Sequence, residues 1–452
     1  MKNLLIIFLT TVSTGLNAQN YGLIQATEIA SMPTPTSNNA VVGGWANDTA
    51  YVYSFGGIDN TKIWSGINKK SFRYNTVTDI WDTIPDLPNT NAVIAAGASY
   101  VDSIIYIMGG YQVLSNGNEI SSNIVNRFDP RTNTYLSDGA AIPIPIDDHV
   151  QAVWNDSLIY VITGWSNTGN VPNVQIYDPA NDNWLTGTSV PNNNTYKAFG
   201  ATGIIINNKI YYHGGAVSSG NFPGQTNLRV GQIDPNDPTQ ISWSSTWVTN
   251  YISYRAIALF DSWTNLPVFV GGSDNTYNYN GVAYNGAGGV SPKSFSIGFD
   301  NSQSLPLGYG KARNSVTLKN NPINDSLLPM DLRGVAFPYS QFSYITGGML
   351  RNQAVSNKTF RIEFLHTTKI KEHQQNVEFS IYPNPTSENL NLVFDKSENR
   401  TITLIDILGK TVYQTKSNEN KLQIDVSNYP KGVYFVQVKT EKDVSALKIV
   451  VE

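Results

Sequence analysis

The sequence predicts an all-β protein in which six copies of one strand motif form a six-bladed β-propeller, followed by a small β-sandwich domain. The motif is a short run of β-branched and aromatic residues that ends in glycine, as in residues 104–110. The last glycine of each copy falls at position 57, 110, 164, 215, 272 or 348. Intervals of about 50 residues match the length of one four-stranded propeller blade.

A second pattern follows the glycines and predicts two further strands in each copy. After a polar loop, one aromatic residue is followed seven positions later by another, as in Tyr74 and Trp81 or Tyr177 and Trp184. The residues between them are rich in Asp, Pro and Asn, which tight turns favour. We expect the two aromatic side chains to lie on adjacent strands and to pack against the neighbouring blade.

The glycine pair, the aromatic pair and a closing Leu-Pro together resemble the kelch repeat, which forms one blade of a β-propeller. The resemblance covers residues 20–366 and is clear in the first three blades. In the fifth blade, Tyr284 and Phe295 fill the aromatic positions. Residues 296–331 then make this blade longer than one repeat requires, so they form either a long loop or a degenerate extra blade. We expect the loop.

The two ends of the repeat array predict how the propeller closes. The sixth repeat provides strands and then runs into a polar, charged linker without a fourth strand. Residues 21–33 carry an apolar run with a Met-Pro ending but have no strand motif before them. We expect this segment to complete the sixth blade as its outermost strand, because such closure leaves no open sheet edge.

Both ends of the chain carry features of an exported protein. Residues 1–18 combine Lys2, a short apolar run and small residues before Gln19, which is typical of a secretory signal peptide. The propeller is expected to span residues 19–366 and a linker residues 367–375. Residues 376–452 are richer in charge and alternate in the manner of strands, so they are expected to form the sandwich domain.

The sandwich segment resembles the type A sorting domain of the type IX secretion system. The resemblance begins at residues 382–385, Tyr-Pro-Asn-Pro, and spans the whole segment. It implies that the secretion machinery is a partner, that most of residues 376–452 is removed, and that the protein passes through the periplasm to the outer surface or the medium. The alternative is a generic β-sandwich module. Because the chain has no cysteine, its fold must rest on packing without disulfides.

Function in such a propeller is expected where the loops before the innermost strands meet at one end of the channel. These strands begin near Asn39, Asn91, His149, Lys197, Arg255 and Arg333. Four of the six positions can carry positive charge, which predicts a cationic ring for a carboxylate, a sulfate or an acidic peptide. The expected ligand-binding residues are therefore Asn91, His149, Lys197, Tyr254, Arg255 and Arg333. The alternative is a structural role for each, with hydrogen bonds to loop carbonyls or packing between blades.

Composition and motifs exclude several other functions. A net charge of −4 gives no basic face for nucleic acid, and no apolar run after the signal peptide reaches membrane length. No spacing of His, Asp or Glu predicts a metal site, and no glycine-rich loop or serine elbow predicts a cofactor or acyl chemistry. His213 stands where the other copies are mostly apolar, so we expect it to be buried in the core.

Kelch-repeat enzymes provide two comparisons. Copper-radical oxidases need a cysteine cross-linked to a tyrosine, and the missing cysteine excludes that activity. Sialate mutarotases are similar in having six kelch blades after a signal peptide. That resemblance implies an arginine for the sugar carboxylate, here Arg255 or Arg333, and an acid/base group, for which Glu119, Asp147 and Asp148 are candidates.

A uronate polysaccharide lyase is a further enzyme alternative. It would need a base beside a cation that neutralises the uronate, and His149 with Arg255 is the pair that the sequence offers. Because no catalytic constellation stands out, we expect a binding protein for an anionic glycan or sugar acid. A mutarotase, epimerase or lyase is the alternative.

Overall fold

The computed structural model describes residues 23–248, 251–262, 264–293, 296–298, 311–313, 316–319, 328–365, 379–406, 410–440 and 444–452. The predicted signal peptide and linker lie outside these residues. The chain divides into two compact units, and the division falls between residues 367 and 368. Apart from two 3₁₀ turns, Trp64–Gly66 and Arg351–Gln353, the regular elements of the described residues are all strands.

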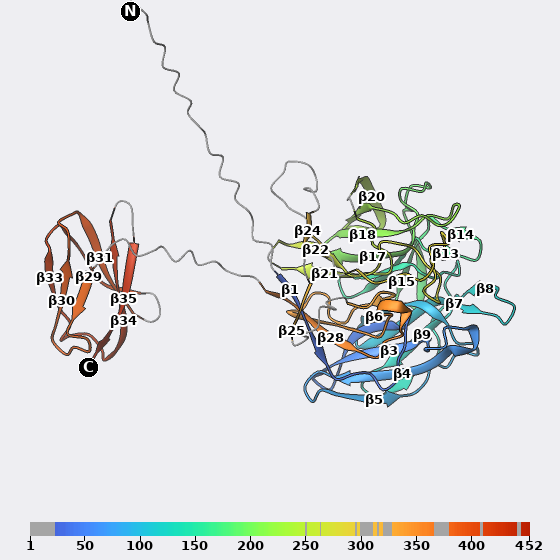
Figure 1. The fold of residues 1–452 in the computed structure, drawn as a ribbon, viewed down its shortest axis with the longest axis horizontal. Coiled ribbons are helices and arrows are strands. Elements are labelled where there is room, and N and C mark those ends of the chain that lie inside the picture. Colours follow the sequence, from blue (N-terminus) through green and yellow to red (C-terminus); the bar gives the residue numbers. More distant parts are fainter. Residues whose placement is uncertain are drawn as a thin grey trace, which may run out of the picture. The chain divides into compact units, whose positions relative to one another are not determined.

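The larger unit is a six-bladed propeller, as predicted (Figure 1). From the innermost strand outward, the first blade contains β2 (Ala40–Ala46), β3 (Thr49–Ile58), β4 (Ile67–Asn75) and β5 (Ile80–Ile84), and the second contains β6 (Ile94–Val101), β7 (Ile104–Val113), β9 (Val125–Asp129) and β10 (Thr134–Tyr135). The third blade contains β11 (Val150–Trp154), β12 (Leu158–Ile162), β15 (Val174–Asp178) and β16 (Asn183–Gly187), and the fourth contains β17 (Phe199–Ile206), β18 (Lys209–Ala216), β19 (Asn227–Asp234) and β20 (Asp237–Val248). The fifth blade contains β21 (Ile257–Asp261), β22 (Leu266–Val270), β23 (Ser296–Gly298) and β24 (Lys311–Arg313), and the sixth contains β26 (Arg333–Gly334), β27 (Phe342–Thr346), β28 (Thr359–Leu365) and β1 (Leu23–Ile29).

The N-terminal strand completes the sixth blade, as predicted from residues 21–33, but it is not the outermost strand, because a further strand pairs along its outer edge. β1 pairs antiparallel with β28 over its whole length, from Leu23↔Leu365 to Ile29↔Thr359. Figure 1 shows β1, in blue, beside β28, in orange. Ile24 and Ala26 are buried between the fifth and sixth blades. The first and last blades are also joined at the axis, because β26 pairs in parallel with β2.

The glycine pairs are explained by contacts between successive blades. The second glycine has positive φ, for example 85° at Gly110 and 81° at Gly215, which glycine adopts without strain. Its N–H donates to the loop before the next innermost strand: Gly110 to Ile146 O and Gly215 to Ser253 O, each at 2.9 Å. A Cβ on the preceding glycine would collide with the same carbonyl. The repeated motif is therefore the joint between blades.

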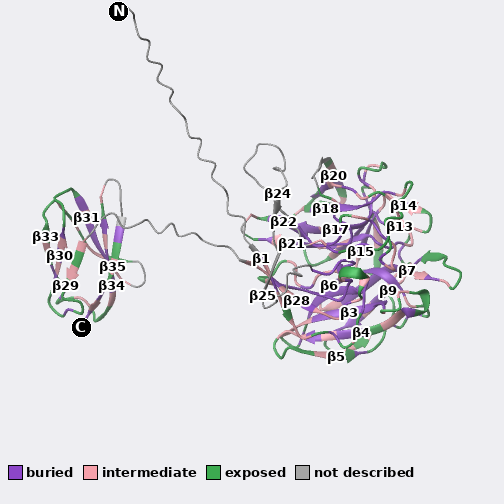
Figure 2. Cartoon of the chain, viewed as in Figure 1, coloured by how far each residue is buried: buried purple, intermediate pink, exposed green. Residues whose placement is uncertain are grey.

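The aromatic pairs lie on the third and fourth strands, as predicted. Tyr74 and Trp81 have ring centroids 5.4 Å apart, and Tyr177 and Trp184 have centroids 5.1 Å apart. Tyr177 also packs edge-on against Tyr106 of the second blade. Buried residues, purple in Figure 2, are concentrated on the propeller strands, so each blade packs its faces against its neighbours.

Two expectations for the fifth blade are wrong. Tyr284 lies in a turn on the loop side and not on a strand, and Phe295 falls outside the described residues. Parts of 296–331 form strands: β23 and β24 complete the fifth blade, and β25 (Val316–Lys319) runs parallel to β1 at the edge of the sixth. The stretch is therefore neither a plain loop nor an extra blade. The insertion that lengthens the blade is residues 273–293, which follow its glycine pair.

The smaller unit packs two antiparallel sheets face to face. One sheet contains β29 (Phe379–Tyr382), β30 (Asn389–Phe394) and β33 (Lys421–Asp425), and the other contains β32 (Thr411–Ser417), β31 (Arg400–Asp406), β34 (Gly432–Lys439) and β35 (Val444–Val451). Alternate residues such as Leu390, Leu392, Ile402 and Val436 form its core. Among the residues that the structure describes, none belongs to a helix of the length and apolarity needed to cross a membrane.

Truncation of Ile24 tests the closure of the propeller. We expect Ile24→Ala to lower the free energy of unfolding by about 2–5 kcal/mol, because it leaves a cavity between two blades. Urea denaturation followed by tryptophan fluorescence measures the change. Glu28→Ala, on the exposed side of the same strand, is the matched control and should change it by less than about 0.5 kcal/mol. Equal effects of the two substitutions would mean that β1 does not complete the sixth blade.

Candidate functional site

Six residues form a ring around the axis at the end of the channel where the innermost strands begin. Each blade contributes one residue with φ between 48° and 64°, a region that residues other than glycine seldom adopt. We term these residues the axial ring: Asn38, Ala95, Asp148, Gly200, Arg255 and Asp331.

The backbone of the axial ring is hydrogen-bonded from blade to blade. Asp148 N–H donates to Ala95 O at 3.2 Å, Gly200 N–H to Asp148 O at 2.8 Å, and Arg255 N–H to Gly200 O at 2.9 Å. These bonds require each residue to turn toward the axis, which accounts for the positive φ. The ring narrows the channel and holds the side chains of Asp148, Arg255 and Asp331 at its centre.

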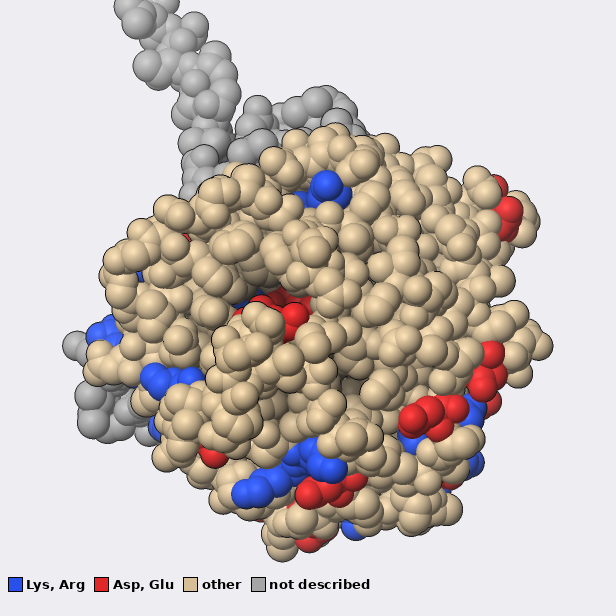
Figure 3. Space-filling model, turned by 90° about the vertical axis from the view of Figure 1, so that its right-hand side faces the viewer, with Lys and Arg blue, Asp and Glu red and all other residues tan. Residues whose placement is uncertain are grey.

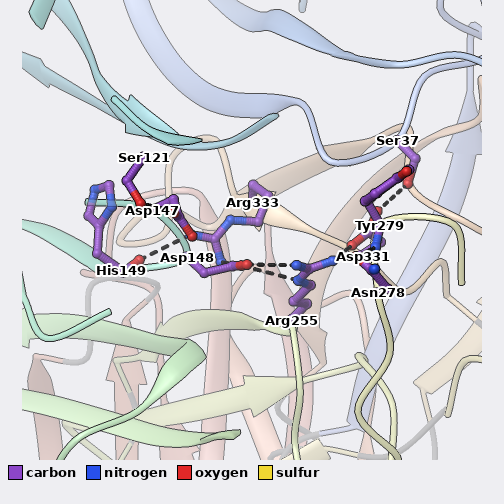
Figure 4. Close-up of polar contacts among 10 residues, drawn as sticks. All are labelled: Ser37, Ser121, Asp147, Asp148, His149, Arg255, Asn278, Tyr279, Asp331 and Arg333. Carbon is purple, nitrogen blue, oxygen red and sulfur yellow. Dashed lines mark hydrogen bonds and ion pairs between the residues drawn. The ribbon is translucent and has the colours of Figure 1, made fainter. Parts of the chain in front are cut away.

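Arg255 crosses the axis and forms ion pairs with two of the other ring residues (Figure 4). Its Nε and Nη2 donate to the two carboxylate oxygens of Asp148 at 3.1 and 2.6 Å, and its Nη1 donates to Asp331 Oδ1 at 2.8 Å. Ser37 Oγ donates to the other oxygen of Asp331 at 2.6 Å. All three charged side chains are at most 3% exposed. One guanidinium therefore links the third, fifth and sixth blades.

The ion pairs determine the protonation states at the axis. Burial alone would raise the pKa of Asp148, but the guanidinium groups of Arg255 and Arg333 outweigh burial and hold it below its usual value. Burial raises the pKa of Asp331, and Arg255 offsets this only in part. The paired carboxylates raise the pKa of Arg255 well above its usual value against the effect of burial. Arg255 is therefore always charged, and Asp148 is ionised.

The residues predicted to bind ligand do not form one ring of free cations. Arg255 is buried and paired, and Tyr254 lies fully buried beneath its guanidinium, whose carbon is 5.1 Å from the centre of the ring. His149 and Arg333 line a large hollow that runs along the innermost strands. Asn91 is exposed and Lys197 half-buried, and neither lines a hollow on the axis within the described part of the chain. The expected net positive charge is balanced, because Asp148 and Asp331 occupy equivalent ring positions.

A small hollow opens at the axial ring on the face of the propeller that carries β8 (Glu119–Ser121), β13 (Trp165–Ser166) and β14 (Gly169–Asn170) (Figure 1). Figure 3 shows this face, with acidic side chains in red at the centre of the depression. The hollow has a volume of about 100 Å³. We term it the loop hollow, and its lining is Tyr111, Glu119, Asp147, Asp148, Trp165, Phe199, Phe222, Asn278 and Tyr284.

Aromatic rings form a continuous wall of the loop hollow. Trp165 packs edge-on against Phe199 and Phe222, with centroids 5.4 and 5.7 Å apart, and Phe222 packs against Tyr284 at 4.8 Å. The backbone of Trp165 is held in position by two hydrogen bonds that it exchanges with the backbone of Asp147, each at 2.9 Å. The wall is thereby attached to the loop that provides the carboxyl groups.

Asp147 differs from Asp148 although the two are adjacent in the chain. Its Oδ2 accepts a hydrogen bond from Ser121 Oγ at 2.5 Å, and no Lys or Arg among the described residues forms an ion pair with it. Burial and then the charge of Asp148 raise its pKa well above the usual value. Glu119 lies at the rim of the hollow, and partial burial of its carboxyl group raises its pKa. The pKa values of the two adjacent carboxyl groups are therefore shifted in opposite directions, a pattern that is often found at functional sites.

A larger hollow lies on the opposite side of the axial ring. It follows the innermost strands to the face where the turns between the first and second strands lie, and it has a volume of about 560 Å³. The two hollows share no lining residue among those described. We term the larger one the channel. The axial ring with its ion pairs therefore separates two hollows on one axis.

His213 is a core residue, as predicted. It is fully buried against Phe269, with ring centroids 5.3 Å apart. Burial lowers its pKa to about 3, so the ring is neutral. The sequence reasoning did identify Glu119, Asp147 and Asp148 as candidate acids, and the structure brings them together. The sequence did not indicate that Asp148 and Asp331 form ion pairs with Arg255, or that aromatic residues form a wall beside them.

Substitution of Arg255 tests the ion pairs of the axial ring. We expect Arg255→Met to lower the free energy of unfolding at pH 7 by about 3–5 kcal/mol, because two buried carboxylates lose their partner. Urea denaturation at several pH values measures this loss. Without the guanidinium, burial raises the pKa of both carboxyl groups, so they take up protons as the pH falls and the difference from the wild type narrows toward pH of about 4.

Two comparisons separate this effect from a general loss of charge. Arg131→Met removes a surface arginine and should leave stability unchanged. Adding Asp148→Asn and Asp331→Asn to Arg255→Met should recover part of the lost stability at pH 7. A loss that stays constant from pH 7 to pH 4 would contradict the ion-pair account.

Known proteins resemble each unit separately. Residues 380–452 match a family described as "Secretion system C-terminal sorting domain". Kelch-like protein 15 of Homo sapiens is 28% identical over 136 residues, which cover 30% of this chain and 21% of that protein. Kelch-like protein terF of Aspergillus terreus is 26% identical over 180 residues, or 37% of each protein. Ulvan lyase NLR42 of Nonlabens ulvanivorans is 28% identical over 94 residues, 21% of this chain and 18% of that protein.

A solved structure described as "Structure of YjhT" has the same fold over most of the chain. It superposes with a TM-score of 0.54 at 16% sequence identity and covers 73% of this chain and 95% of that one. The chain spans between 18% and 37% of the length of the curated relatives named above. It is a kelch-type β-propeller that carries a type IX C-terminal sorting domain, which directs export to the cell surface or the medium.

Proposed function

We propose that this exported propeller binds a glycan across the loop hollow. The observation that carries the proposal is the meeting of three carboxyl side chains, Glu119, Asp147 and Asp148, with an aromatic wall. Carboxylates accept strong hydrogen bonds from hydroxyl groups, and aromatic rings provide the apolar surface that ligand sites use. A hollow of about 100 Å³ holds one group of a larger molecule. The glycan therefore lies across the mouth and inserts one substituent.

The charges at this end favour a neutral or amino sugar. The sequence alone favoured an anionic glycan or sugar acid, through cations at the channel mouth. The guanidinium of Arg255 forms ion pairs with Asp148 and Asp331 and is therefore not available to a ligand. Three carboxyl groups line the hollow. An added carboxylate would be repelled by the ionised Asp148, whereas hydroxyl or ammonium groups would find acceptors. Similarity to a protein named as an ulvan lyase, over 21% of this chain, also supports a glycan ligand.

Removal of Trp165 tests glycan binding at the loop hollow. On an array of neutral, amino and uronate glycans, we expect the protein to bind neutral or amino sugars. Trp165→Ala should weaken that binding about tenfold or more, because large aromatic anchors dominate binding energy. Trp45→Ala removes a half-exposed tryptophan from the channel side and is the matched control, with no expected effect. Binding restricted to uronates, or an equal loss in both variants, would contradict the proposal.

A sugar-converting enzyme is the second candidate, and the adjacent carboxyl groups of Asp147 and Asp148 in the loop hollow, with a raised pKa at Asp147, favour it. A carboxylic acid that stays protonated near neutral pH can donate a proton to a sugar ring oxygen. Ser121 occupies Asp147 Oδ2, which leaves Oδ1 for a substrate. The ionised Asp148 beside it maintains the raised pKa. Interconversion of sugar anomers needs only such an acid/base group and a positioned substrate.

Substitution of Asp147 tests the enzyme candidate. If the protein catalyses mutarotation, Asp147→Asn should slow it by about 100-fold or more, measured by NMR as the rate at which α and β anomers exchange. The wild-type rate should fall as the pH rises through the raised pKa of Asp147, because the acid form is lost. Asp156→Asn, an exposed aspartate on the opposite face, is the control. A wild-type rate equal to that of buffer alone would remove this candidate.

A further inference from the structure

We infer that the channel is a second binding site, which takes a monocarboxylate with an apolar body through the face opposite the loop hollow. This goes beyond the proposed function, because it concerns the other end of the axis and a different ligand. The inference rests on the size of the channel, on a buried arginine at its closed end and on the chemistry of its walls and mouth.

The channel has the dimensions of a ligand pocket. Its volume of about 560 Å³ lies within the usual range of about 300–1,000 Å³ for small-molecule sites. Small and aliphatic residues such as Ala98, Val150, Ala201 and Ala258 line it along the innermost strands. Its inner end is closed by the axial ring. Within the described part of the chain the channel opens on the turn side, so a ligand entering there meets the inner end with its leading group.

Arg333 offers an available guanidinium edge at the closed end. Its side chain is 5% exposed, and it makes two contacts: Nη2 donates to His149 O at 3.1 Å, and Nη1 lies 3.3 Å from Asp148 Oδ1. No acceptor among the described residues lies within hydrogen-bonding distance of its Nε. A buried donor without a partner is costly. A ligand carboxylate on the Nε edge would satisfy it in the fork geometry that arginine favours.

The charge of Arg333 is less neutralised than that of Arg255. Asp148 makes shorter contacts with Arg255, at 2.6 and 3.1 Å, than with Arg333, and Asp331 also pairs with Arg255. Arg333 therefore faces the channel with the weaker of the two ion pairs. An incoming anion competes with one 3.3 Å contact and does not have to break the central pair.

A short hydrogen-bonded chain along the channel wall adds a neutral donor to the lining. The His149 ring contacts Gln151 Oε1 through Nε2 at 2.9 Å, and Gln151 Nε2 donates to Ser99 Oγ at 2.9 Å. Burial lowers the pKa of His149 to about 4, so it adds no charge. Ser99 accepts in this chain and keeps its own proton for another acceptor. The wall of the channel therefore offers a ligand a neutral hydroxyl donor in addition to the guanidinium of Arg333.

The mouth of the channel favours an apolar tail over a second charge. Trp45 is 50% exposed there and packs edge-on against Phe337 at 6.1 Å, and Tyr339 is held by a hydrogen bond from its hydroxyl to Ile205 O at 2.6 Å. Asp156 is the charged residue of the rim among the described lining, and it repels anions. A polyuronate or a dicarboxylate is therefore disfavoured. The matching ligand is an elongated monocarboxylate.

Calorimetric titration of the full chain with octanoate tests this site. We expect octanoate to bind, and octan-1-ol and octanedioate to bind about tenfold more weakly or worse, because the first lacks the carboxylate and the second places a charge at the mouth. Arg333→Gln should weaken octanoate binding about tenfold or more, as expected for loss of a charged hydrogen-bond donor. Arg131→Gln removes a surface arginine and should leave binding unchanged.

A second variant keeps the test valid if Arg333→Gln disturbs folding. Thr202 lines the channel and is half-buried, so Thr202→Trp should fill the cavity and abolish octanoate binding while Arg333 stays intact. Thermal melting of each variant identifies misfolding. Trp165→Ala, in the loop hollow, should not affect octanoate, which separates this test from that of the proposed function. Equal binding of octanoate and octan-1-ol, or unchanged binding in Thr202→Trp, would overturn the inference.

Discussion

The ion pairs of Arg255 with Asp148 and Asp331 are the interaction on which the ends of this propeller depend. They join the third, fifth and sixth blades across the axis, where neighbouring blades otherwise meet only pairwise. Buried charges of this kind contribute little net stability when complete, but loss of one partner is strongly destabilising. The network therefore specifies the geometry of the ring more than it stabilises the fold. It also closes the channel, so that one axis carries two hollows with different chemistry.

The backbone of the axial ring stores strain that the ion pairs and blade contacts hold in place. Positive φ is tolerated by Asn38, Asp148 and Asp331, whose short polar side chains suit that region, and by Gly200 without cost. Ala95 and Arg255 adopt it against their preference, at about 1–2 kcal/mol each. Strain of this kind persists where the surroundings determine the conformation, and it concentrates at functional sites. Here it points the side chain of Arg255 at the axis.

The fold could be predicted from sequence because its signals are local. A glycine pair such as Gly109-Gly110 indicates, from two adjacent residues alone, both a backbone with positive φ and a close contact with the next blade. The fifth blade was assigned wrongly because an insertion after its glycine pair shifts its two outer strands to Ser296–Gly298 and Lys311–Arg313, so one repeat length no longer marks them. The candidate site was predicted only in part. Arg255 was identified by its position, but its partner Asp148 is 107 residues away, and no periodicity relates the two. A ring of cations was therefore expected where the structure has balanced pairs.

Asp148 belongs to both ends of the axis, and this connects the two hollows. Its carboxylate lines the loop hollow and raises the pKa of Asp147 there, while its Oδ1 contacts Arg333, which faces the channel. An anion bound to Arg333 would weaken the contact between Arg333 and Asp148. The charge of Asp148 would then be less neutralised and would raise the pKa of Asp147 further. A cation or hydroxyl group in the loop hollow acts on Arg333 through the same carboxylate. If ligands occupy both hollows as proposed, reciprocal linkage requires their binding free energies to be coupled through Asp148. The separation of the hollows is therefore steric, whereas their electrostatics are shared.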